Sequence, residues 1–282
     1  MIRPRVPVDG AGVARHYDDL DRFYRELWGE HLHHGLFGNG GSQEPQAAAA
    51  RLLTLVADRA GIRPGARICD VGCGYGATAR VMAEEYGARV TGVTLSKAQW
   101  DHAMAGVGHL PGVELRLQDW MENDLPSQAF DAVVAIESLS HMPDKARFFR
   151  EAARVLKPGG RIVVCAWLAR EEPGGWETRA LLEPICTEGR LAGLASRSEV
   201  RGLMRGAGLQ VSSDEDLSRR VAPTWTISAR RVMGGLIRSQ EYRRFLFSSG
   251  VVDRVFALTV LRIRLAYALG AMRYGLFTGR RE

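Results

Sequence analysis

Short apolar runs rich in β-branched residues alternate along the middle of the chain with segments whose apolar positions recur at helical spacing. The helical segments are expected at about 77–86, 96–106 and 143–156. The apolar runs predict five β-strands, at Arg67–Val71, Arg89–Thr94, Val113–Gln118, Phe130–Ile136 and Arg161–Trp167. Strands and helices that alternate at this spacing are typical of βαβ units, and therefore of a parallel sheet covered on both faces.

The segments on either side of this alternation extend the pattern. Residues 13–35 are expected to be helical, and Pro45 opens an alanine-rich helix that closes at Gly61, as helices commonly do. Past Trp167 the pattern predicts helices at 176–189 and 198–207, a sixth strand at Gln210–Leu217 and a final strand at 274–281. Before that final strand, residues 222–272 form a long segment in which apolar residues alternate with Arg.

Together these elements predict one structural domain with an α/β fold. We expect a Rossmann-like, seven-stranded, mostly parallel sheet with helices on both faces and a helical cap. The expected parts are an N-terminal helical arm and lid at 1–62, the Rossmann-like core at 63–218, the cap at 219–272 and the final strand at 273–282. Ligands of such folds bind at the carboxyl ends of the parallel strands, so the candidate site is sought there.

The composition is that of a globular protein. Hydrophobic residues make up 46% and charged residues 25% of the 282 residues, which excludes a disordered chain. The four cysteines form no CxxC pair; they are Cys69, Cys73, Cys165 and Cys186. Reduced thiols in a cytoplasmic protein are the simplest interpretation of this pattern.

Charge is distributed unevenly along the chain, whose net charge is +6. Residues 219–282 hold 13 Arg, no Lys and three acids, a net charge of +10, so the first 218 residues carry −4. Such a basic segment can face an anionic substrate or membrane surface, or form a solvated helical face. No nucleic-acid partner is expected, because the segment is rich in apolar residues and has no recognised nucleic-acid motif. No transmembrane segment is expected either, because four Arg interrupt the apolar stretch at 251–277.

The segment ICDVGCGYGA (68–77) comprises the first predicted strand from Ile68 onward and the glycine-rich turn that follows it. Gly72, Gly74 and Gly76 let a ligand approach the backbone closely, but dinucleotide enzymes share this pattern. Two details separate the alternatives. Asp70 lies two residues before the first glycine, where a carboxylate can hold an ammonium group, and the second strand ends without the acid that binds an NAD ribose. Both details favour S-adenosylmethionine over NAD.

Four motifs extend this argument along the chain: DVGCGYG (70–76), GVTLSKAQ (92–99), LQDW (117–120) and VLKPGGRIVV (155–164). In these motifs the chain resembles the class I S-adenosylmethionine-dependent methyltransferases. The resemblance implies that Thr94 and Gln99 replace an acid at the cofactor ribose, that Asp119 meets the adenine amino group and that Trp120 lies beside the adenine ring. The cofactor-binding residues that it implies are Asp70, Gly72, Gly74, Thr94, Leu95, Gln99, Asp119 and Trp120, with His34 and Gly35 at the cofactor entrance.

Three further segments narrow the resemblance: YDDLDRFYRELWGEHLHHGLF (17–37), ESLSHMPDK (137–145) and RRVAPTW (219–225). They are similar to the tocopherol-type and terpenoid C-methyltransferases of small-molecule metabolism. O-methyltransferases of sugar-bearing natural products and a few cyclases that reuse the fold share similar segments. The implied partner is a lipophilic small-molecule acceptor.

C-methylation leaves a cation on the acceptor, which aromatic rings and a carboxylate can stabilise. Glu137 follows the fourth strand at the edge of the sheet where ligands bind, and the resemblance implies that the acid at this position stabilises the cation and accepts the proton. Three aromatic side chains are expected to line the acceptor site: Tyr17, Trp167 and Trp225. We assign Tyr17 to the catalytic residues, with Glu137 and His141, and the two Trp to binding of the acceptor. Our first expectation is therefore a C-methyltransferase acting on an isoprenoid alkene or a prenylated aromatic compound through a carbocation.

O-methylation requires a base for a hydroxyl group, often a His that a carboxylate supports. His141 is the available imidazole, but Ala166 and Trp167 after the fifth strand offer no Asp to support it. An O- or N-methyltransferase of a natural product that uses His141 as base is the alternative, and a cyclase that reuses the fold is the second. No metal is expected, because His31, His33 and His34 lack carboxylates at ligand spacing. The N-terminal arm and the apolar cap leave room for a homo-oligomer.

Overall fold

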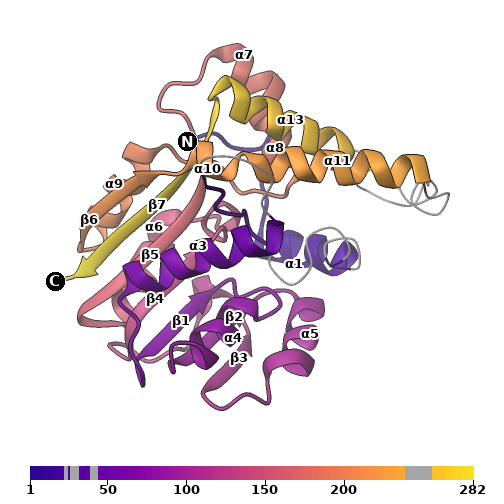
Figure 1. Ribbon diagram of the computed structural model, residues 1–282. Helices are drawn as coiled ribbons and strands as arrows, with labels where there is room; N and C mark the ends of the chain where they lie inside the picture. Colours follow the sequence, from indigo (N-terminus) through magenta and orange to yellow (C-terminus); the bar gives the residue numbers. More distant parts are fainter. Residues whose placement is uncertain (22–24, 26–31, 39–43, 239–255) are drawn as a thin grey trace.

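The strands of the protein are β1 (Arg67–Val71), β2 (Arg89–Thr94), β3 (Val113–Leu117), β4 (Phe130–Ile136), β5 (Leu156–Ala169), β6 (Leu209–Asp216) and β7 (Met272–Arg281). In the computed structural model, which describes residues 1–21, 25, 32–38, 44–238 and 256–282, they form one central sheet (Figure 1). Its order is β3-β2-β1-β4-β5-β7-β6. β1 to β5 run parallel, and β7 runs antiparallel between β5 and β6. The predicted seven-stranded, mostly parallel, Rossmann-like sheet is confirmed.

Helices cover both faces of this sheet, as alternate residues of β4 demonstrate. Val133 and Ala135 belong to one apolar core, and Ala132 and Val134 belong to a second core. Successive side chains of a strand point to opposite faces, so these cores lie on opposite sides of the sheet. The first core includes residues of α6 (Lys145–Val155) and α9 (Arg197–Gly206). The second core includes residues of α3 (Pro45–Ala60), α4 (Ala77–Glu84) and α10 (Ser218–Val221). Helix α5 (Lys97–Val107) packs on β3.

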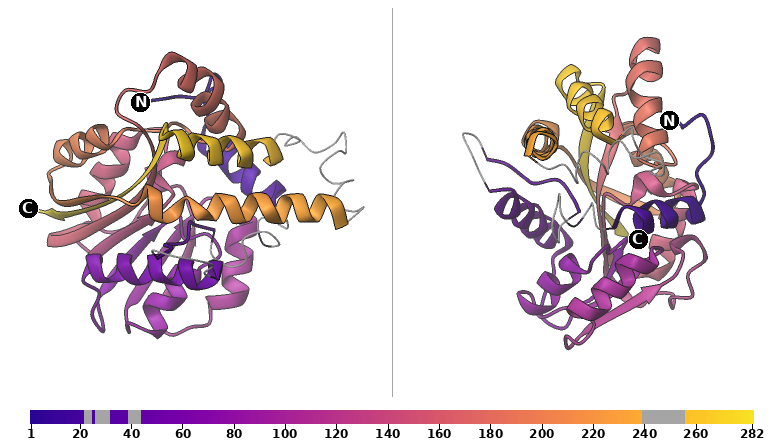
Figure 2. Two further views of the ribbon diagram at one scale, coloured as in Figure 1. Left: turned by 45° about the horizontal axis from the view of Figure 1, so that its top comes forward. Right: turned by 90° about the vertical axis from the view of Figure 1, so that its right-hand side faces the viewer.

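The cap contains two long helices, α11 (Pro223–Arg238) and α13 (Phe256–Leu269), which lie side by side and extend past the sheet (Figures 1 and 2). A third apolar core joins them to a segment that precedes β6 in sequence: Leu182 and Ile185 are buried together with Trp225 and Ile263. That segment comprises α7 (Gly175–Glu177), the π-helical turn η3 (Thr178–Leu182) and α8 (Glu183–Glu188). The apolar core of the cap thus includes residues that the expected boundary placed with the Rossmann-like core. None of the helices in the described part of the chain is long and apolar enough to cross a membrane.

Local signals fix the ends of several helices. The Ser96 hydroxyl accepts a hydrogen bond from the Gln99 N–H and so begins α5, and the Asp144 carboxylate does the same for α6 with the Arg147 N–H. Gly61 closes α3 with a φ of +63°, and a Cβ at this position would lie 2.4 Å from the Arg161 guanidinium. The helix end predicted at Gly61 therefore depends on glycine for both its conformation and its space.

The N-terminal segment differs from the continuous helix expected at 13–35. Helix α1 (Gly10–Asp19) covers its first part, and residues 22–24 and 26–31 lie outside the described residues. Residues 32–37 are not helical, so the expectation is wrong for 32–35. The backbone N–H of Leu36 donates to Ala48 O at 2.7 Å and that of Phe37 donates to Arg220 O at 2.9 Å. These contacts with distant segments replace the bonds that a helix would make four residues back.

Candidate active site

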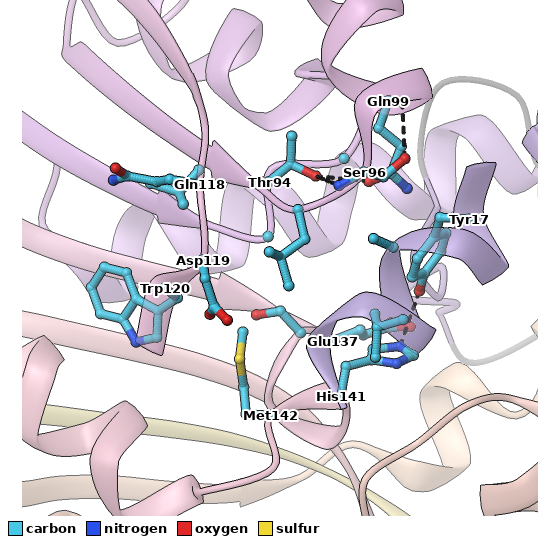
Figure 3. A pocket seen from close by; sticks show the side chains of 18 of the residues that line it. Tyr17, Thr94, Ser96, Gln99, Gln118, Asp119, Trp120, Glu137, His141 and Met142 are labelled. Carbon is cyan, nitrogen blue, oxygen red and sulfur yellow. Dashed lines mark hydrogen bonds between the residues drawn. The ribbon is translucent and has the colours of Figure 1, made fainter. Parts of the chain in front are cut away.

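Two cavities meet at the carboxyl ends of the central strands. The first is lined by the glycine turn after β1, by the ends of β2 and β3, and by Val13, Ala14 and Tyr17 of α1 (Figure 3). The second lies between the sheet and the cap, where Trp167 and Trp225 face apolar residues of α8 and α13. Four residues line both cavities: Tyr17, Leu32, Glu137 and His141. These four residues therefore lie at the junction of the two cavities.

The glycine turn forms one end of the first cavity. Gly72 has a φ of +80°, and a Cβ there would lie 2.5 Å from the Ser138 Cβ, so no other residue fits. Gly74 has a φ of +53° and faces open space. Asp70, just before the turn, is buried, and its Oδ2 has no hydrogen-bond partner among the described residues. Burial raises the pKa of Asp70 to about 7. A buried carboxylate oxygen without a partner is suited to a cationic group of a ligand.

The other end of the first cavity is polar and ordered by hydrogen bonds. The Thr94 hydroxyl donates to Gln99 Oε1 at 3.0 Å and accepts from the Ser96 N–H at 3.3 Å (Figure 3). Because the amide oxygen of Gln99 is used in this way, its NH2 group remains to donate to a ligand. Farther along, Asp119 accepts from the Met121 N–H at 2.7 Å, and Trp120 is buried beside it. Leu95 and Gln118 also line this cavity.

Helix α1 closes the first cavity and is fastened to α5. The Asp18 carboxylate accepts from the Ser96 hydroxyl at 2.6 Å and from the Ala98 N–H at 3.0 Å. These two donors belong to the first turn of α5, where a negative charge is also favoured by the helix dipole. Helix α1 of the N-terminal segment thus lines the same cavity as the cofactor motifs.

Glu137 lies where the two cavities meet, and its carboxylate is surrounded by hydrogen-bond donors. Oε1 accepts from the His34 backbone N–H at 2.7 Å, from His34 Nδ1 at 2.8 Å and from the Tyr274 hydroxyl at 2.8 Å. Oε2 accepts from Trp167 Nε1 at 2.7 Å. Burial alone would raise the pKa of Glu137, but the interactions with His34 outweigh burial and lower the pKa to about 2. The residue also has a φ of +64°, a strained conformation of the kind found at functional sites.

The tautomer of His34 follows from its partners. The Trp225 indole N–H, which can only donate, lies 2.6 Å from His34 Nε2. Nε2 is therefore the acceptor, and Nδ1 carries the proton that is donated to Glu137. Four aromatic rings surround the imidazole at centroid distances of 4.9 to 5.8 Å, those of Trp167, Trp225, Tyr267 and Tyr274. His34 and Glu137 are thus held in one arrangement by neutral donors.

His141 is oriented by a backbone carbonyl. Its Nδ1 lies 3.1 Å from Arg190 O, and a carbonyl only accepts, so Nδ1 carries the proton. Arg190 has a φ of +50°, the left-handed conformation in which its carbonyl meets the imidazole. The remaining nitrogen, Nε2, accepts from the Tyr17 hydroxyl at 3.0 Å (Figure 3). Burial lowers the pKa of His141 to about 4, so the ring is neutral at physiological pH and Nε2 is a proton acceptor at the junction of the two cavities.

The structure places most of the expected site residues in one of the two cavities. Seven of the cofactor residues line the first cavity: Gly72, Gly74, Thr94, Leu95, Gln99, Asp119 and Trp120. His34 lines the second cavity rather than the first, and the Gly35 N–H donates to the Thr224 hydroxyl at 3.1 Å. Trp167 and Trp225 line the second cavity, as the acceptor assignment requires.

Three functional residues carry no signal in the local sequence. Tyr267 and Tyr274 contact His34 from the cap and from β7, and Arg190 contributes only its carbonyl oxygen. The position of Tyr274 could have been found only by pairing the final strand with β5. As for metals, the described residues contain no group of three or more His, Cys, Asp or Glu side chains that could hold an ion, and His31 lies outside them.

Comparison with known proteins adds to this geometry. The family model described as "Mycolic acid cyclopropane synthetase" matches residues 8–234. The chain is 34% identical to 27-O-demethylrifamycin SV methyltransferase of Amycolatopsis mediterranei, over 100% of this chain and 99% of that protein. It is 30% identical to the chloroplastic tocopherol O-methyltransferase of Arabidopsis thaliana, over 95% and 81%. Among solved structures, the [4+2]-cyclase SpnF superposes with a TM-score of 0.79 at 29% identity, covering 99% of this chain and 98% of that one.

Proposed function

This chain belongs to the mycolic acid cyclopropane synthetase family, which comprises S-adenosylmethionine-dependent methyltransferases, and on that premise we propose that it methylates a hydroxyl group of a lipophilic natural product. The observation that carries the proposal is His141 Nε2, a neutral proton acceptor that lines both cavities. The four cysteines are buried as free thiols, which supports a cytoplasmic location.

The residues of the first cavity, together with Asp70 just before the glycine turn, fit S-adenosylmethionine. The unpartnered Asp70 Oδ2 suits its ammonium group, the glycine turn suits a close approach to the backbone, and the Gln99 amide suits its ribose. When bound, this cofactor supplies a methyl group that is electrophilic because it is attached to a positively charged sulfur. With the nucleoside held by the polar groups at the ends of β2 and β3, the residues that the two cavities share would lie nearest its reactive methyl group.

His141 activates the acceptor in this proposal. The acceptor hydroxyl takes the place of the Tyr17 hydroxyl and donates its hydrogen bond to His141 Nε2, which accepts the proton. The Arg190 carbonyl holds the proton on Nδ1, and the nearby Glu137 carboxylate favours the positive charge that the ring acquires. The Arg190 carbonyl therefore orients the imidazole of His141, as an Asp carboxylate does in other sites. His141 can accept a proton although no Asp follows β5.

We propose for Glu137 a role other than the catalytic one expected from the sequence. Its Oε1 already accepts three hydrogen bonds and its Oε2 one, so the carboxylate is poorly placed to take a proton from the acceptor. We assign it to positioning: it fixes His34 and Trp167 in the wall of the acceptor cavity. Its buried negative charge also favours the cationic donor next to it.

C-methylation is the second candidate, and one observation favours it. The rings of Trp167, Trp225 and Tyr274 gather beside an ionised carboxylate, an arrangement that stabilises a carbocation. In that case the proton must leave to a group other than Glu137, and His141 is again the nearest acceptor in the shared wall.

Product analysis with 13C-methyl S-adenosylmethionine distinguishes the candidates. Acceptors suggested by the relatives' names, 27-O-demethylrifamycin SV and a tocopherol precursor with a free hydroxyl, are offered to the enzyme, and the label is located by NMR. We expect the labelled methyl on oxygen. Label on carbon would favour the second candidate, and conversion without S-adenosylhomocysteine would point to a cyclase.

A further inference from the structure

A third cavity lies outside the candidate active site, as a groove bordered by α10, α11, α13 and the start of α3. It is the largest of the three, with a volume of about 980 Å³. Its side chains include five arginines: Arg219, Arg230, Arg231, Arg264 and Arg273. Glu44 is the one carboxylate among the described residues that line it. The groove is therefore a concentrated site of positive charge, and part of the basic excess found in the sequence gathers in it.

The arginines of helix α13 illustrate how the groove differs from the rest of the surface. Arg262 faces α8 and forms an ion pair with Glu188. Arg264, two residues later, faces the groove, and its Nε donates to an uncharged group, the Thr226 hydroxyl, at 3.4 Å. Elsewhere, Arg59 and Arg197 pair with carboxylates at 2.7 Å. Surface arginines of this protein thus commonly have a carboxylate partner, whereas Arg264 faces other arginines.

Arg273 is held at the groove by the backbone. Gly270 ends α13 with a φ of +70°, and a Cβ there would lie 2.9 Å from a guanidinium nitrogen of Arg273. The absence of a side chain at 270 leaves the guanidinium room in the groove. Its ion pair with Asp216 is long, at 3.8 Å, so this carboxylate neutralises it weakly. The Arg273 guanidinium can therefore direct some of its N–H groups toward a ligand in the groove.

We propose that this groove is a binding site for a phosphate-bearing ligand. Guanidinium groups bind phosphate oxygens in pairs through their planar fork, and several of them around one cavity suit a doubly charged anion better than a single carboxylate. The like charges of Arg219, Arg230 and Arg264 repel one another, and a bound phosphate offsets that repulsion. The site is separate from methyl transfer and does not depend on which atom is methylated. The phosphate can belong to a soluble phosphate ester or to a lipid headgroup.

Calorimetric titration with inorganic pyrophosphate at constant ionic strength tests the site. We expect saturable binding to the wild type and a loss of affinity of about tenfold or more in the double variant Arg230→Gln/Arg264→Gln. The matched control, Arg150→Gln/Arg205→Gln, removes two exposed arginines from α6 and α9, across the sheet from the groove. It should bind within about twofold of the wild type. An Arg230→Lys/Arg264→Lys variant keeps the positive charges but lacks the planar guanidinium groups that bind two phosphate oxygens at once. Its affinity for pyrophosphate should lie between those of the wild type and the Gln double variant.

A second arm identifies the source of the phosphate. Sedimentation with vesicles of phosphatidylglycerol, compared with phosphatidylcholine, should retain the wild type and not the Gln double variant if the ligand is a lipid headgroup. Pyrophosphate binding without vesicle binding indicates a soluble phosphate ester. The proposal is overturned if pyrophosphate does not bind saturably, or if the Gln double variant binds it as the control does.

Discussion

The two cavities of the active site are built in opposite ways. The cofactor cavity is lined by short stretches at strand ends: Gly72 and Gly74 of the glycine turn, residues of 93–99, and 118–120. The acceptor cavity draws its groups from segments as distant as His34, Trp225 and Ile263. The first can be assembled from local motifs, since each motif carries its strand and its turn with it. The second exists only after the cap has packed on the sheet.

The cavities also differ in how their polar atoms are satisfied. Asp70 Oδ2 and Gln118 Nε2 are buried without a hydrogen-bond partner among the described residues. On the acceptor side, Glu137 accepts four hydrogen bonds, and His34 uses both ring nitrogens. The cofactor cavity is therefore suited to a polar, cationic ligand, and the acceptor cavity to an apolar one. His141 Nε2 is the reactive group at their junction.

The largest effect should come from removing the proton acceptor at the junction. His141→Ala should lower kcat by about 100- to 10,000-fold, because general base catalysis contributes that much. Cofactor affinity, measured by calorimetry, should stay within about twofold, since the cofactor contacts lie on the other side of the cavity. His109→Ala, at an exposed imidazole, is the control. Unchanged turnover in His141→Ala would remove this residue from the chemistry.

Glu137→Ala should destabilise the acceptor side by about 3 kcal/mol, because it leaves several buried donors of His34, Trp167 and Tyr274 without an acceptor. The free energy of unfolding is measured by denaturant titration. Glu114→Ala, at an exposed position, should change it by less than about 0.5 kcal/mol. If the two variants were equally stable, the hydrogen bonds of Glu137 would not stabilise the acceptor side of the site.

Asp70→Asn should weaken S-adenosylmethionine binding by about tenfold to a hundredfold through the lost charge-assisted hydrogen bond. The pKa of about 7 adds a pH test. The cofactor-free protein keeps a proton on Asp70 below this pH, whereas a cationic ligand requires the carboxylate. Binding should therefore release a proton near neutral pH, and affinity should increase from about pH 6 to pH 8.

Calorimetry in buffers of different ionisation enthalpy detects that proton. It should be absent in Asp70→Asn and present in Asp124→Asn, whose side chain is exposed. Proton release that persists in Asp70→Asn would assign the titration to another group and weaken the role of Asp70.

The smallest effect is expected for Tyr17→Phe. The Tyr17 hydroxyl occupies His141 Nε2 only until the acceptor replaces it, so its loss should change kcat by no more than about fivefold. Tyr86→Phe serves as the control. A decrease in kcat as large as that of His141→Ala would instead indicate that Tyr17 transfers a proton, in agreement with its sequence-based assignment to the catalytic residues.

Much of the fold can be predicted from the sequence, and the contrast between the cavities explains what cannot. The apolar runs predict β1, β2 and β4 with the bounds that the structure has, because buried parallel strands are continuous apolar runs. The glycine turn and the β2 motif likewise predict the cofactor side. Residues 32–35 are mistaken for helix because the partners of their backbone N–H groups, Glu137 for His34 and Thr224 for Gly35, are distant in sequence. The Arg190 carbonyl escapes prediction because its position depends on backbone conformation and on the packing of the cap, which its side chain does not reveal.

A crystal structure with S-adenosylhomocysteine and a hydroxyl-bearing acceptor tests the central claim most directly. The account predicts the acceptor oxygen within about 2.6–3.2 Å of His141 Nε2, with the Tyr17 hydroxyl displaced and the oxygen facing the sulfur. An acceptor whose carbon faces the sulfur, with its hydroxyl away from His141, would contradict it.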